Sequence, residues 1–357
     1  MGDKVLGRMA YVDAMKGISI FLVVFAHSLM NAERNLDSEF AFIINICAYV
    51  SVPSFFFING FLYKHKSTLT PVQAIIKKFK AYYIPFVGFS LFFWLFHNVF
   101  VRLCLTSEEI YSIKDYAKNF VLIFAAHMES ELNGAMWFLR ALLIMVCIYI
   151  LIEYPVYKIS DKKTRYIVLT IIIAAMFYMG KKGYITKIYN LNRIFYSLSF
   201  FYMGILFREF KINEFIDKHR VIAFIAGISV LICFSYIFYG GLGQNVGFKD
   251  LPASYFGIMG LFSFSKFPVI QKSRLLNLLG RASLDIMSLH FLAFKLVSFI
   301  YIQIYALDIT RLSEAPVLKD IHGLYFIPYV IVGIGLCIAE YMIRQKICKR
   351  LFKKDKK

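Results

Sequence analysis

Charged residues are scarce in this chain of 357 residues, since Asp, Glu, Lys and Arg together make up only 18% of it. Soluble globular proteins carry about 25% charged and roughly 45–50% apolar residues, whereas 59% of this chain is apolar. Ten membrane spans of about 20 residues each would use a similar share of the positions. The composition therefore argues against a soluble enzyme or a disordered chain and predicts an all-α, polytopic integral membrane protein.

Cysteine pairs and clustered metal ligands are also lacking. The six cysteines contain no Cys-x-x-Cys pair and mostly lie inside apolar runs, so neither a disulfide framework nor a metal site is expected. No acidic or histidine cluster has the spacing of metal ligands. No small-residue cleavage site follows the first apolar run, which is therefore expected to be a retained helix and not a removed signal peptide.

Long apolar runs recur ten times along the chain, which predicts about ten transmembrane helices. The first and sixth runs are short, and local bilayer thinning or burial among other helices would accommodate them. The approximate limits of the runs are Gly17–Met30, Phe40–Tyr63, Ala81–Val101, Gly134–Tyr154, Tyr166–Gly180, Ile194–Phe207, Val221–Gly240, Leu251–Phe267, Ala282–Tyr305 and Gly323–Ile343.

The basic residues are distributed unevenly between the connections of these spans. If the chain starts in the cytoplasm, 28 of the 41 Lys and Arg residues fall in cytoplasmic segments and 11 in outer ones, as the positive-inside rule requires. An even number of spans then places both termini in the cytoplasm. Topology thereby explains the net charge of +19, so no nucleic-acid partner is expected, and residues 351–357 are expected to form a basic cytoplasmic tail.

Two outer segments are unusual. The connection before the sixth span is expected outside but carries four cations, so either a span is miscounted or these cations serve a function. They are Lys181, Lys182, Lys187 and Arg193. The long segment Ile110–Glu131 contains an apolar stretch, Phe120–Ala126, that is too short to cross a bilayer. This stretch is expected either to be re-entrant or to lie on the membrane surface.

The first span carries two ionisable residues, Lys16 and His27. Eleven residues correspond to about 1100° of helical rotation, so the two side chains share one helix face, about 16 Å apart along the axis. Ionisable residues inside a span are costly and indicate a functional site by default. A cation at the cytoplasmic mouth suits a phosphate-bearing group, and a neutral imidazole deeper in the span suits general-base chemistry. The alternative is a snorkelling lysine and a histidine hydrogen-bonded to another helix.

This opening helix resembles that of the membrane-bound acyltransferase 3 family, whose first helix carries the motif Arg-x10-His. The corresponding residues here are Lys16-x10-His27. The second span, PSFFFINGFLY over residues 53–63, is similar to the family segment P-x-F-F-F-x-S-G-F. Residues 280–290, GRASLDIMSLH, resemble its G-x-x-S-x6-H segment. The remaining matches are Lys77–Pro85, Trp137–Leu139 and Phe201–Gly204. Because the segments follow the family's order, residues 1–350 are expected to form one acyltransferase 3-like transmembrane domain.

Some positions depart from the family pattern. Lysine stands at position 16 for the commoner arginine, which keeps the charge but loses the bidentate fork for phosphate. Asn59 replaces the usual serine before Gly60. In the segment Lys77–Pro85, lysines stand where family members often have arginine. The sequence does not show which of Lys77, Lys78 and Lys80 corresponds to that arginine.

The resemblance implies transfer of an acyl group, usually acetyl, from coenzyme A to a hydroxyl of an exported or lipid-linked glycan, in a bacterial cytoplasmic membrane. Acyl-CoA would be a donor substrate, with no permanently bound cofactor. Cations at the inner mouth would bind its phosphates, Asn59 and Gly60 would allow close backbone approach, and His27 would be the general base; the candidate cations are Lys16, Lys77, Lys78 and Lys80. Succinyl or another acyl group fits as well as acetyl, and both direct attack and an acyl-His27 intermediate stay open.

Four further residues are candidates for acceptor binding or transition-state support. Trp137 and Arg140 share a face in the outer half of the fourth span, Arg193 begins the sixth span, and His290 lies mid-membrane in the ninth. The structural alternatives are an arginine stacked on tryptophan or paired with an acid, an interfacial anchor at Arg193, and a packing histidine.

Two other functions are compatible with parts of this pattern. A secondary transporter or polysaccharide flippase would also have about ten spans with intramembrane Arg and His. Proton-coupled transporters, however, usually place acids at mid-membrane near broken helices, and here such acids are scarce, with Asp285 the clearest. A sensor or scaffold without chemistry would leave the alignment of Lys16 and His27 unexplained.

Overall fold

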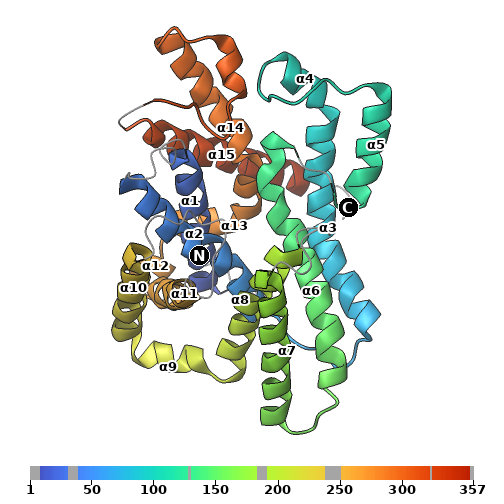
Figure 1. Ribbon diagram of the computed structural model, residues 1–357, viewed down its shortest axis with the longest axis vertical. Coiled ribbons are helices and arrows are strands. Elements are labelled where there is room, and N and C mark those ends of the chain that lie inside the picture. Colours follow the sequence, from blue (N-terminus) through green and yellow to red (C-terminus); the bar gives the residue numbers. More distant parts are fainter. Residues whose placement is uncertain are drawn as a thin grey trace. The chain divides into compact units, whose positions relative to one another are not determined.

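The computed structural model describes residues 9–30, 39–127, 130–182, 191–237, 251–321 and 324–353. Within these residues the chain is helical and contains no strands, as the composition predicts. The chain divides into two compact units, and Figure 1 labels the helices. Unit 1 comprises residues 1–54, 104–107 and 214–357, and unit 2 comprises residues 55–103 and 108–213.

Unit 1 is assembled around the first helix, α1. Helices α11 to α15 all pack against α1, and α10 packs on α11. The elements are α1 (Ala10–Leu29), the first part of α2 (Glu39–Leu62), α9 (Ile212–Lys218), α10 (Arg220–Ile237), α11 (Leu251–Ser265), α12 (Pro268–Gln271), α13 (Arg274–Arg281), α14 (Ser283–Ile304), the 3-10 helix η3 (Ile309–Ser313) and α15 (Phe326–Lys353).

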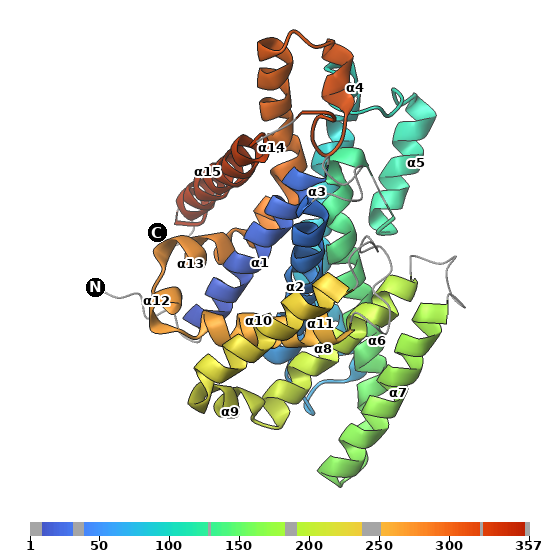
Figure 2. The ribbon, with the colours of Figure 1, turned by 60° about the vertical axis from the view of Figure 1, so that its left-hand side comes forward.

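Two glycines let α1 and α13 pack backbone against backbone, and Figure 2 shows the two helices side by side. A Cβ at Gly17 would collide with the carbonyl of Leu276, and a Cβ at Gly280 would collide with the carbonyl of Asp13. Small residues permit such close approach of membrane helices. This contact holds the half of α1 that carries Lys16.

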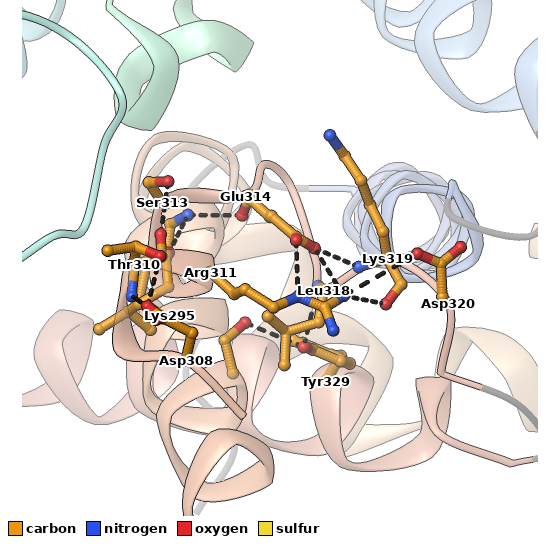
Figure 3. Close-up of polar contacts among 12 residues, drawn as sticks. Lys295, Asp308, Thr310, Arg311, Ser313, Glu314, Leu318, Lys319, Asp320 and Tyr329 are labelled. Atoms are coloured by element: carbon orange, nitrogen blue, oxygen red, sulfur yellow. Dashed lines mark hydrogen bonds and ion pairs between the residues drawn. The ribbon is translucent and has the colours of Figure 1, made fainter. Parts of the chain in front are cut away.

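The segment after α14, residues 305–320, folds into a compact structure that we call the cap (Figure 3). Lys295 of α14 is 3% exposed, and its Nζ donates to the carbonyls of Leu312 at 2.9 Å and Glu314 at 2.7 Å. Arg311 donates to the Glu314 carboxylate at 2.8 Å and to the carbonyl of Lys319 at 2.6 Å. The buried ammonium of Lys295 is thereby hydrogen-bonded to the cap, which it holds on α14.

Replacing Lys295 by methionine should destabilise the protein by about 3 kcal/mol, because hydrogen bonds from a charged donor are lost and two carbonyls are left without that donor. The measurement is thermal unfolding of the purified protein in detergent. Lys319→Met is the matched control, since the Lys319 amine points away from the other side chains of the cap in Figure 3. Equal shifts for the two variants would contradict the anchoring role.

Unit 2 contains the remaining helices. Helix α6 packs against α3, α7 and α8, and α7 packs against α8. The elements are the end of α2 from Phe55, α3 (Pro71–Leu95), α4 (His97–Arg102), α5 (Ile113–Phe124), the 3-10 helix η2 (Glu131–Met136), α6 (Trp137–Val156), α7 (Lys162–Lys182) and α8 (Leu191–Glu209).

A second pair of glycines brings α2 and α8 into contact within unit 2. A Cβ at Gly60 would collide with the backbone carbonyl of Phe201, and a Cβ at Gly204 would collide with that of Phe57. The crossing lies in the two segments that resemble family motifs, residues 53–63 and 201–204. Helix packing therefore explains the glycines of both segments.

Seven helices of the described residues are long and apolar enough to cross a membrane; they cover residues 10–29, 41–62, 131–156, 162–182, 220–237, 283–304 and 326–350. Each of the ten predicted spans falls on a helix. The other three helices are α3, α8 and the 15-residue α11, which do not meet these length and composition limits. A multi-pass membrane protein is therefore supported, and the count of about ten and the cytoplasmic termini stay predictions.

The third predicted span, Ala81–Val101, differs from the helix found there. Helix α3 begins ten residues earlier, at Pro71, because Thr70 and Gln73 form a capping box and proline suits the first helical turn. It ends before Phe96, after which the short α4 begins. Consequently Lys77, Lys78 and Lys80 lie on α3 and not in a loop before it.

The short apolar stretch of the segment Ile110–Glu131 falls at the end of α5. Ser112 and Asp115 cap this helix at its start. Trp94 of α3 donates its indole hydrogen to the carbonyl of Tyr116 at 3.0 Å, and the Tyr83 hydroxyl donates to the carbonyl of Phe124 at 2.6 Å. Helix α5 therefore runs antiparallel along α3.

Candidate functional site

The face of α1 that carries Lys16 and His27 is turned into unit 1. Ile20 and Val24, which lie between them on this face, are 0% exposed, and Val23 is 7% exposed. Both Lys16 and His27 are half-buried. Because α1 is one uninterrupted helix from Ala10 to Leu29, the predicted alignment of the two side chains follows directly from its geometry.

His27 lies against His290 of α14, which is 263 residues away in the sequence. Nδ1 of His27 is 2.9 Å from Nε2 of His290, and the two rings are nearly parallel, 12° apart. His290 is 0% exposed, and its Nδ1 is 2.8 Å from the carbonyl oxygen of Ile286 one turn earlier. The ring of Phe291 packs edge-on against His27 at 4.9 Å. Two predicted site residues are thus in direct contact.

The start of α14 is tied to α15 by charged groups. Asp285 is 3% exposed and pairs with Arg344, which also donates to Glu340 at 3.0 Å. Glu340 and Arg344 are four residues apart on α15, and Asp285 of α14 has its partner on that other helix. Further along α14, the ring of Phe294 packs so closely on Gly333 of α15 that a Cβ there would collide with it. These contacts fix the helix that carries His290.

The three lysines of α3 lie in different surroundings. Lys77 and Lys80 are exposed, whereas Lys78 is half-buried with its Nζ 5.4 Å from the ring centre of Tyr63. Burial lowers the pKa of Lys78, and the neighbouring charges of Lys77 and Lys66 lower it further. The charged form of Lys78 would therefore be favoured by an anion bound beside it.

Asn59 and Gly60 both take part in packing within unit 2. The Asn59 amide donates to the carbonyl of Phe55 at 2.8 Å and accepts a hydrogen bond from the Tyr82 hydroxyl at 3.0 Å. Asn59 therefore links α2 to α3, the helix of the three lysines. Gly60 lies against the backbone of Phe201, as described above.

A group of polar and aromatic residues lies at the start of α6. The Arg193 guanidinium is 5.4 Å from the ring centre of Trp137, a cation–π distance, while Arg140 is buried, at 4% exposure. Trp137 and Arg193, predicted from separate spans, are thus brought together. Lys181 likewise lies over the ring of Tyr196 at 5.0 Å, while Lys187, in the same basic connection, lies outside the described residues.

Sequence reasoning missed two buried polar residues of α6 and η2. Asn133 is 3% exposed, and neither atom of its amide has a hydrogen-bond partner among the residues described. Glu153 is 2% exposed; its carboxylate accepts from the Tyr63 hydroxyl at 2.5 Å and lies 3.0 Å from Nδ1 of His65. For Glu153, an acidic residue at the end of an apolar run was a sequence feature that could have indicated a buried polar site. No comparable sequence feature marked Asn133.

Comparison with protein families decides the identity of the chain. Residues 9–345 match the acyltransferase domain that defines the acyltransferase 3 family. The chain belongs to the acyltransferase 3 family. This match spans nearly the whole chain and both units of the acyltransferase, and the predicted resemblance is confirmed. Neither the curated proteins nor the solved structures contain a match to the chain.

The family and the apolar helices together identify this protein as a multi-pass membrane acyltransferase. Membership of the acyltransferase 3 family favours acyl transfer over the transporter, flippase and scaffold alternatives. In this acyltransferase, the two histidines of unit 1 are the predicted site residues that the structure brings into hydrogen-bonding contact.

Proposed function

We propose that this acyltransferase moves an acyl group, acetyl in the simplest case, from cytoplasmic acyl-CoA to a hydroxyl of an exported or lipid-linked glycan, with His27 as general base. The observation that carries the proposal is the hydrogen bond between His27 and His290 on the inward face of α1. Both histidines lie in motifs shared with the family, and their contact orients the half-buried His27 as a base of the kind that acyl transfer to an alcohol needs.

The donor would be held through its phosphates by cations at the cytoplasmic side. Lys16 lies on the same face as His27, about 16 Å from it along the helix axis, so the pantetheine arm would run along α1 towards the imidazole. Lys78 is the favoured lysine of α3, because it is half-buried beside an aromatic ring and an anion would offset the repulsion from Lys77 and Lys66 that lowers its pKa. Lys77 and Lys80 are exposed and would contribute to the surrounding positive potential.

The chemical step would be attack of the acceptor oxygen on the thioester carbonyl. A sugar hydroxyl is not ionised at neutral pH, so His27 would take its proton as the carbon–oxygen bond forms. The carbon–sulfur bond would then break, and the same proton would leave with the coenzyme A thiol. The acyl group passes from sulfur to oxygen without any change of oxidation state.

The acceptor would be bound at the outer side, where Trp137, Arg140 and Arg193 are expected to lie. An aromatic ring with an arginine over it presents an apolar face and several hydrogen-bond donors, which suits the apolar face and hydroxyl edge of a sugar ring. Asn133, with an unpartnered buried amide in the described part of the chain, would add a donor and an acceptor.

The proposal is tested by giving purified protein in lipid nanodiscs acetyl-CoA together with surface glycan from cells that lack it. We expect release of free coenzyme A thiol and transfer of labelled acetyl to the glycan. Succinyl-CoA and longer acyl-CoA donors establish the acyl group. Glycan movement across liposomes without thiol release from any donor would instead support the transporter alternative.

Lys16→Met is expected to raise the KM for acyl-CoA by about 10-fold to 100-fold with a smaller effect on kcat, because a charge-assisted contact to phosphate contributes about 1.5–3 kcal/mol. The measurement is thiol release at varied donor concentration. Lys16→Arg, which keeps the charge, should retain donor affinity. An acylated pantetheine without phosphates should bind wild type and variant equally. An unchanged KM for acyl-CoA in Lys16→Met would remove Lys16 from the donor site.

A further inference from the structure

The hydrogen bonds of the two histidines determine which nitrogen of each ring carries its hydrogen. Nδ1 of His290 lies 2.8 Å from the carbonyl oxygen of Ile286, and since a carbonyl only accepts, this nitrogen is the donor. In a neutral imidazole the other nitrogen then accepts. Nε2 of His290 therefore accepts the hydrogen of Nδ1 of His27 across 2.9 Å. The lone pair of His27 is left on Nε2.

The surroundings favour this one arrangement. His290 is 0% exposed and lies among the rings of Phe291 and Phe294, so water does not supply an alternative partner for its nitrogens. His27 is only half-buried, and its Nε2 has no hydrogen-bond partner within the part of the chain that the structure describes. One nitrogen of His27 is thus committed to α14, and the other remains available to a substrate.

We propose that His290 is a positioning residue that holds His27 in the Nδ1–H tautomer, so that Nε2 is the nitrogen that takes the acceptor proton. The inference rests on the proposed function of His27 as base and deepens it by naming the reacting atom and the residue that orients it. The chain of hydrogen bonds runs from the backbone carbonyl of Ile286 through His290 to His27. It resembles the use of a carboxylate to orient a catalytic histidine, with a neutral imidazole in place of the acid.

The tautomer matters because free neutral imidazole side chains prefer the hydrogen on Nε2. Without an acceptor at position 290, His27 would adopt that form, and its lone pair would sit on Nδ1, facing α14. The hydroxyl proton could then not be accepted at the open nitrogen. During the reaction the same hydrogen bond would stabilise the imidazolium of His27, since Nε2 of His290 accepts from it in both protonation states.

The direct test is the 15N spectrum of the protein labelled at histidine nitrogens, in nanodiscs, with the His27 signals assigned by their loss in His27→Gln. In the wild type we expect a hydrogen-bearing Nδ1 and a bare Nε2 at His27. In His290→Leu we expect the reverse at His27. His290→Gln, whose amide oxygen can accept the same hydrogen bond, should restore the wild-type tautomer.

Kinetics supply the second measurement. His290→Leu should lower kcat by about 100-fold or more with an unchanged KM for acyl-CoA, because its His27 carries the wrong tautomer, and His290→Gln should recover much of the loss. Phe291→Leu is the packing control: it alters the contact with both rings but keeps the acceptor, so the His27 tautomer should stay as in the wild type.

Two results would overturn the proposal. One is a hydrogen-bearing Nε2 at His27 in the wild type, and the other is a His27 tautomer and kcat that His290→Leu leaves unchanged. A poorly folded His290→Leu would move the test to His290→Gln and to the wild-type spectrum, which alone decides the tautomer. The failure of the proposed function is seen separately, as retained turnover in variants that lack the His27 imidazole.

Discussion

Replacing His27 by alanine is expected to reduce acyl transfer to the background level, with kcat lowered by about 100-fold to 10,000-fold, the usual contribution of a general base. The physical reason is that the acceptor hydroxyl would have no group to take its proton as it attacks the thioester. The protein should still fold, because His27 lies at the end of α1 and its removal leaves the glycine contact of α1 with α13 intact. Thiol release and labelled-acetyl transfer by purified variants measure the effect.

The matched control for His27→Ala is His219→Ala, because His219 is an exposed histidine of the same unit whose ring lies 4.8 Å from that of Phe215. It should keep wild-type turnover. Expression and melting temperature of both variants show whether a loss of activity reflects unfolding. Wild-type turnover in a well-folded His27→Ala would remove the histidine from the mechanism and with it the proposed role of α1.

Gly60→Ala is expected to destabilise the acyltransferase by about 3 kcal/mol or to prevent its folding. The added Cβ would collide with the backbone carbonyl of Phe201, and backbone on both sides of the α2–α8 crossing leaves no flexible side chain to move away. Overpacking of this kind ordinarily costs about 1–3 kcal/mol and sometimes more. The yield of monodisperse protein and its melting temperature in detergent measure the effect.

Gly88→Ala provides the comparison within the same unit, since a Cβ at Gly88 of α3 meets nothing within 4 Å. It should be neutral or slightly stabilising, because alanine is favoured over glycine in a helix. The pair of variants also separates the two roles open to Gly60. A stable Gly60→Ala protein with a raised KM for acyl-CoA would favour the donor-binding role over the packing role.

The class of protein and the character of its first helix follow from the amino-acid sequence alone. Scarce charge and long apolar runs require a bilayer-embedded helical chain, because every backbone group must be hydrogen-bonded within the helix there. The alignment of Lys16 with His27 was also predictable, since the period of a helix is a local property of the backbone. The order of short motifs was sufficient to predict the family, which the match over residues 9–345 confirmed.

Which of these residues come into contact depends on how the helices pack. His27 and His290 are 263 positions apart, and no local periodicity relates the faces of two separate helices. The structure likewise distinguished Lys78 from Lys77 and Lys80, and paired Trp137 with Arg193. Packing determines such contacts, because the position of one helix against another depends on where glycines permit backbone approach, as at Gly60 and at Gly280.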